Sequence, residues 1–122
     1  MKNKGIVLIP FSSTIDVDNF ARKYNLQDKY SGMFLHQIDK NHPNKFIIII
    51  EDWNFEDIPK EIWKSFNQKN SGSAYYFERK EDLNDFREHF YPSSLYLPKQ
   101  VPLNKGWLLI STEIESPIFI HI

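Results

Sequence analysis

Apolar positions recur along the chain with two different spacings, one typical of strands and one typical of helices. Short runs of β-branched and aromatic residues predict six strands, and apolar stripes with helical spacing predict three helices. The expected strands cover residues 5–11, 33–38, 46–50, 74–77, 107–110 and 118–120. The expected helices cover about residues 14–24, 58–66 and 80–90.

The first expected helix has the clearest end signals. Ser13 or Thr14 can cap its start, and Asp16 follows Ser13 at the spacing of a capping box. Basic residues close its last turn, where the helix dipole favours positive charge. Its expected apolar stripe consists of Ile15, Val17, Phe20, Ala21 and Tyr24.

The run at residues 46–50, Phe followed by four Ile, has no polar alternation. We therefore expect both faces of this strand to be covered, which indicates a central position in a sheet. Residues 92–105 contain three prolines and are expected to be irregular but ordered. The order β-α-β-β-α-β-α-β-β predicts a single α+β domain over residues 1–122, with a mixed or mainly antiparallel sheet covered by about three helices.

Composition narrows the possible classes of protein. The chain has 122 residues, 41% hydrophobic and 16% aromatic, with a net charge of -1, which is typical of a soluble globular domain. It has no cysteine and no apolar run long enough to span a membrane, and its first apolar stretch is short and lacks a cleavage site, so we expect a cytoplasmic protein without a signal peptide. The charge is uneven: residues 46–91 hold ten acidic and six basic residues, whereas residues 1–45 hold four and seven.

Candidate catalytic and nucleic-acid-binding groups have little support in the sequence. The four histidines, His36, His42, His89 and His121, show no metal-ligand spacing, and we expect no metal or cofactor. The serines before the first helix suit capping better than nucleophilic catalysis. Residues 75–77, two Tyr and a Phe, could stack on bases, but the carboxylates that follow would repel phosphates.

The most informative segment follows the isoleucine run. Residues 51–57 contain four carboxylates and two aromatic rings. Three interpretations are open: a solvated loop, a surface that recognises a basic partner, or carboxylates that act as acid and base or hold a metal. Trp53 is either an exposed interface anchor or a core residue at the sheet edge.

The hypothesis drawn from these features is a non-enzymatic immunity protein or antitoxin. Such proteins are compact, slightly acidic and aromatic-rich, an analogy of character only. The expected partner is a basic toxin domain, such as a nuclease, bound in equal stoichiometry by a monomer or weak dimer that contacts neither nucleic acid nor membrane. The expected partner-binding residues are Glu51, Asp52, Trp53, Asn54, Glu56, Asp57 and Glu61.

Two other functions are possible. One is a small metal-dependent hydrolase or nuclease that uses Glu51 and Asp52 at the end of the strand. The other is a homo-oligomeric regulatory domain that pairs strand edges, for example through residues 118–122.

Overall fold

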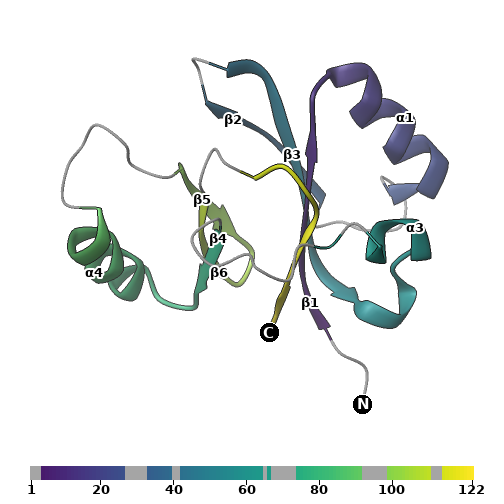
Figure 1. Cartoon of the computed structure of the whole chain (residues 1–122). Helices are drawn as coiled ribbons and strands as arrows, with labels where there is room; N and C mark the ends of the chain where they lie inside the picture. The colour runs from purple at the N-terminus through teal and green to yellow at the C-terminus, as the bar shows by residue number, and fades with distance from the viewer. Residues whose placement is uncertain are drawn as a thin grey trace. The chain divides into compact units, whose positions relative to one another are not determined.

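The computed structural model (Figure 1) describes residues 4–26, 33–39, 42–64, 66, 74–91, 99–110 and 114–122. For residues 33–39 and 42–44 it describes the backbone alone. The chain divides into two compact units. Unit 1 comprises Met1–Lys69 and Glu115–Ile122, and unit 2 comprises Asn70–Ile114. Unit 2 is therefore inserted, in sequence, between the two parts of unit 1.

Unit 1 is built around a four-stranded antiparallel sheet with the order β2-β3-β1-β7. β3 lies between β2 and β1, as the uninterrupted isoleucine run predicts, and Ile47 to Ile50 are at most 1% exposed. The elements of unit 1 are β1 (Lys4–Phe11), α1 (Thr14–Tyr24), β2 (Met33–Asp39), β3 (His42–Asn54), the 3-10 helix η1 (Phe55–Asp57), α3 (Lys60–Trp63) and β7 (Ile118–His121).

Unit 2 contains a three-stranded antiparallel sheet with the order β4-β6-β5. Phe86 lies on the helix of this unit, and Tyr75 and Phe77 lie on its first strand. The ring of Phe86 is 4.6 Å from the ring of Tyr75 and 5.4 Å from the ring of Phe77. The helix thus packs on one face of this sheet. The elements are β4 (Ala74–Phe77), α4 (Lys80–Phe90), β5 (Lys99–Leu103) and β6 (Gly106–Ile110).

These elements confirm the predicted α+β class with antiparallel pairing. The strands form two small sheets, a division that the sequence pattern did not reveal. The single domain over residues 1–122 stays a prediction. In the part of the chain that the structure describes, no helix has the length and apolarity needed to cross a membrane.

Two details of the sequence interpretation were wrong. Residues 99–103, expected to be irregular, form β5 and pair with β6; residues 92–98 lie outside the described residues. Pro102 suggested an irregular segment, but an edge strand such as β5 tolerates proline. Ile15, expected in the apolar stripe of α1, is 69% exposed. It is two residues from buried Val17, which places the two side chains on nearly opposite sides of the helix.

The ends of α1 agree with the sequence signals. Ser13 is the N-cap, and its hydroxyl oxygen accepts a hydrogen bond of 3.2 Å from the backbone N–H of Asp16. Asn25 closes the helix in the left-handed conformation, with φ 53°. Asparagine tolerates this conformation better than most residues do.

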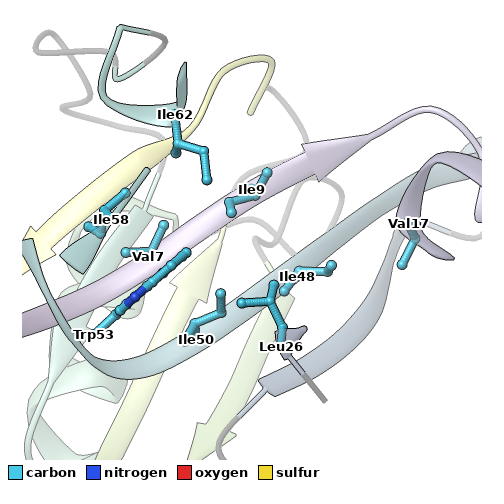
Figure 2. Close-up of a cluster of buried hydrophobic side chains, with 9 residues drawn as sticks. All are labelled: Val7, Ile9, Val17, Leu26, Ile48, Ile50, Trp53, Ile58 and Ile62. Carbon is cyan, nitrogen blue, oxygen red and sulfur yellow. The ribbon is translucent and has the colours of Figure 1, made fainter. Parts of the chain in front are cut away.

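One face of the unit 1 sheet carries a continuous apolar core. Paired positions bring its residues together, because Val7 lies opposite Ile50 and Ile9 lies opposite Ile48. α1 and the segment after β3 supply further buried residues to the same cluster. We call this cluster the sheet core; it consists of Val7, Ile9, Val17, Leu26, Ile48, Ile50, Trp53, Ile58 and Ile62 (Figure 2).

The sheet core predicts a clear contrast between two isoleucines. Ile48→Ala removes a side chain that is 0% exposed, and should lower the free energy of unfolding by about 2–5 kcal/mol. Ile15→Ala makes the same chemical change at a 69% exposed site, and should change it by no more than about 0.5 kcal/mol. Urea denaturation measures both. Equal losses in the two variants would contradict the placement of this core.

Candidate functional site

The acidic segment begins inside β3 and not after it. Residues 51–54 continue the strand, which extends to Asn54. The pairing with β1 is irregular at this point: Val7 lies opposite Ile50, but Gly5 lies opposite Trp53. Two β3 residues, Glu51 and Asp52, therefore stand opposite the single β1 residue between these pairs. This arrangement is a β-bulge.

The bulge changes which side chains share a face of the sheet. In a regular strand, residues three apart point to opposite faces. The extra residue cancels this alternation, so Ile50 and Trp53 both belong to the sheet core. Asp52 supplies the unusual backbone conformation, with φ 58°. Aspartate is one of the few residues that adopt this left-handed conformation with little difficulty.

Trp53 is a core residue, which corrects the expectation that it anchors a partner. Only 2% of its surface is exposed, and its indole lies among the other labelled side chains of the sheet core (Figure 2). An indole at this depth cannot enter a pocket of another protein without local unfolding. Burying it contributes to folding, since a large aromatic ring removes much apolar surface from water.

Glu51 requires a similar correction. It is 8% exposed and is the one charged residue among the buried ones of the described chain. The residue as a whole is therefore largely covered, unlike the exposed acidic residues that follow it in the segment.

The remaining carboxylates of the segment are exposed, as the partner-binding hypothesis requires. Asp52 lies in the bulge, Glu56 and Asp57 lie in η1, and Glu61 lies in α3. We call these four residues the acidic rim. Buried residues alternate with them along the chain: Trp53, Ile58 and Ile62 are at most 5% exposed. The apolar residues thus fix the segment from beneath while the carboxylates point to solvent.

A hydrogen bond and a proline help to order the segment. Asn54, which is half-buried, donates from Nδ2 to Oδ2 of Asp57 over 3.2 Å. This bond joins the end of β3 to η1. Pro59 then forms the N-cap of α3 with φ -56°.

An aromatic cluster lies against the sheet core beside η1 and α3. Phe55 stacks on Trp63 with 4.6 Å between ring centroids, and its ring lies 6.1 Å from that of Phe66. Phe119 of β7 completes the cluster at 5.2 Å from Phe55. No local pattern in the sequence indicates this contact, because 64 positions separate Phe55 from Phe119 (119 − 55).

Gly5 makes room for this cluster. A methyl group at Gly5 would lie 2.5 Å from the Phe119 ring and would also collide with the carbonyl oxygen of Ile120. Gly5 is the residue opposite Trp53, next to the bulge. The lack of a side chain therefore lets Phe119 lie across β1 at this end of the sheet.

The other candidate groups considered from the sequence are the histidines and the aromatic residues of β4. Within the described residues, no three His, Cys, Asp or Glu side chains gather in a way that could hold a metal ion. His89 and His121 are exposed in different units, and the side chains of His36 and His42 lie outside the described part. Tyr75 and Phe77 pack on α4, and Arg79 pairs with Glu81 at 2.6 Å.

Comparison with known proteins returned no match for this chain, whether with family models, with curated proteins or with solved structures.

The bulge predicts how Asp52 tolerates substitution. Asp52→Asn and Asp52→Gly should keep the free energy of unfolding within about 0.5 kcal/mol, because both residues accept a positive φ. Asp52→Val should lose about 1–2 kcal/mol, since a β-branched residue is strained there. Thermal unfolding of the three variants measures this order. If valine were tolerated as well as glycine, the left-handed assignment at Asp52 would be wrong.

Proposed function

We propose that this protein is a non-enzymatic immunity protein or antitoxin that binds a basic toxin domain in the cytoplasm. The acidic rim is the observation that supports the proposal best. Asp52, Glu56, Asp57 and Glu61 are exposed, while the residues between them are anchored in the sheet core. A segment anchored in this way loses little conformational entropy when a partner binds.

The charge of the segment suits a cationic partner. Residues 51–64 contain five acidic residues and two lysines. Toxins that cleave RNA or DNA need positive surfaces to hold phosphates, and those surfaces attract carboxylates. Opposite charge on two partners accelerates their encounter and selects against neutral proteins.

The roles within the site follow from burial. The acidic rim would pair with lysine and arginine side chains of the toxin, and Asn54 would hold Asp57 in place. Trp53 and Glu51 are buried, so they would stabilise the bulge that carries the acidic rim and would not contact the toxin. Such an inhibitor would need no cofactor and would act in equal stoichiometry with its target.

Charge reversal on the rim tests the proposal. The tagged protein is first used to isolate its partner from the native host, and a basic protein that co-purifies in equal amount is expected. Glu56→Lys with Glu61→Lys should then slow association with that partner by about 10- to 1,000-fold at low salt. The association rate of the unaltered protein should fall steeply as salt rises. Stopped-flow kinetics measures both effects, and protection of host cells from the partner supplies the biological readout.

The matched control is Asp85→Lys with Glu88→Lys, which makes the same charge change on α4 in unit 2. It should leave the association rate within about threefold, because α4 is not part of the proposed interface. Asp52 is left unchanged in both variants, since its positive φ would add strain. The proposal fails if no basic protein co-purifies in equal amount, or if both double variants affect association equally.

A further inference from the structure

β7 forms one edge of the unit 1 sheet. β7 is the yellow strand that ends near C in Figure 1, and within the described residues it pairs with β1 alone. The register is unbroken from Leu8 opposite Ile118 to Gly5 opposite His121. The pairing continues one residue further, because the N–H of Ile122 donates to the carbonyl oxygen of Lys4 over 3.1 Å. The bond between Lys4 and Ile122 fixes the hydrogen-bonding phase of the whole strand.

In an antiparallel ladder, directly opposed residues alternate between hydrogen-bonded and non-hydrogen-bonded pairs. Ile122 forms a hydrogen-bonded pair with Lys4, so Ile120 and Ile118 also direct their backbone groups toward β1. Phe119 and His121 occupy the alternate positions. Their N–H and C=O groups therefore point away from β1, toward the outer edge of the sheet.

This edge is short, with four residues in β7, but it lacks other features that commonly prevent strands from pairing. β7 contains no proline, lysine or bulge. The edge strand β5 of unit 2 differs, because it carries Lys99 and an exposed Pro102, both of which discourage pairing. Exposure rises along β7, from Ile118 at 1% to Ile122 at 50% just beyond the strand.

The sequence of this edge is nearly symmetrical. Residues 118–122 read Ile-Phe-Ile-His-Ile, which differs from its own reversal only by the exchange of Phe119 and His121. We infer that β7 pairs with β7 of a second copy of this chain, antiparallel and centred on Ile120. Phe119 then lies opposite His121 of the second copy, and this pair exchanges both backbone hydrogen bonds. Ile120 lies opposite its own counterpart, as a non-hydrogen-bonded pair.

Side chains fit this register on both faces. Phe119 and His121 of one copy already lie on one face, with 6.4 Å between their rings. Pairing would place the same two residue types of the second copy beside them, so aromatic rings meet across the symmetry axis. The isoleucines meet on the other face. The resulting sheet has eight strands, four from each copy.

The paired segment is short, so the dimer should form only at high concentration. A five-residue strand pair buries far less than the roughly 1,200 Å² of a stable interface. Sedimentation equilibrium of the full chain, from micromolar to millimolar concentration, should show a rise from 14.6 kDa toward twice that mass.

Amide hydrogen exchange identifies the interface. As concentration rises, the N–H groups of Phe119 and His121 should exchange about tenfold more slowly when most chains are dimeric. The N–H groups of Ile120 and Ile122 should change less, because they already bond to β1. This alternation distinguishes edge pairing from any other mode of association.

His121→Pro tests the same point by substitution. It removes an outward N–H and none of the bonds to β1, so the variant should fold and remain monomeric. His121→Lys should also abolish the dimer, because a charged lysine on an edge strand discourages pairing with another strand. His89→Lys makes the same change on α4 and should leave the dimer intact.

A mass that stays at 14.6 kDa throughout the range would overturn the inference. A dimer that survives both His121 substitutions, or that protects other amides, would overturn it too. Protection of Phe119 and His121 that appears only when a basic partner is added would assign the edge to that partner instead. None of these results depends on the acidic rim, so the proposed function is tested separately.

Discussion

The β-bulge at Glu51 and Asp52 is the constraint on which the rest of unit 1 depends. By placing two residues opposite one, it returns Trp53 to the face that already holds Ile48 and Ile50. Without the extra residue, Trp53 would point to the other face, together with Ile47 and Ile49. The sheet core would then lose its largest side chain, and the chain would leave the strand in a different direction.

The same constraint explains how one segment can be both strongly charged and well anchored. After the bulge, Trp53, Ile58 and Ile62 are directed inward, and the acidic rim is directed outward. Carboxylates on a free loop would have to be ordered when a partner binds, which costs free energy. Here the core has already ordered the backbone that carries them.

Local patterns predicted the elements whose signals are local. Ser13 and the stripe containing Val17 and Ala21 defined α1, and the isoleucine run placed β3 inside a sheet. Apart from the exposed Ile15, the failures concern pairing between distant segments. The short strand Lys99–Leu103 could not be predicted from its own residues, because its formation depends on pairing with β6. The division into two sheets likewise depends on which strands pair. In the site, composition identified the exposed carboxylates, but the bulge that buries Trp53 and Glu51 depends on the register with β1.

The burial of Trp53 is the most direct test of this account. Replacing Trp63 and Trp107 with phenylalanine leaves Trp53 as the sole tryptophan, since the chain has three. Fluorescence of that variant should show the blue-shifted emission of an indole in an apolar environment, and acrylamide should quench it weakly. Deleting Asp52 from the same variant should shift the emission to the red or unfold unit 1. Red-shifted, readily quenched emission before the deletion would contradict the account.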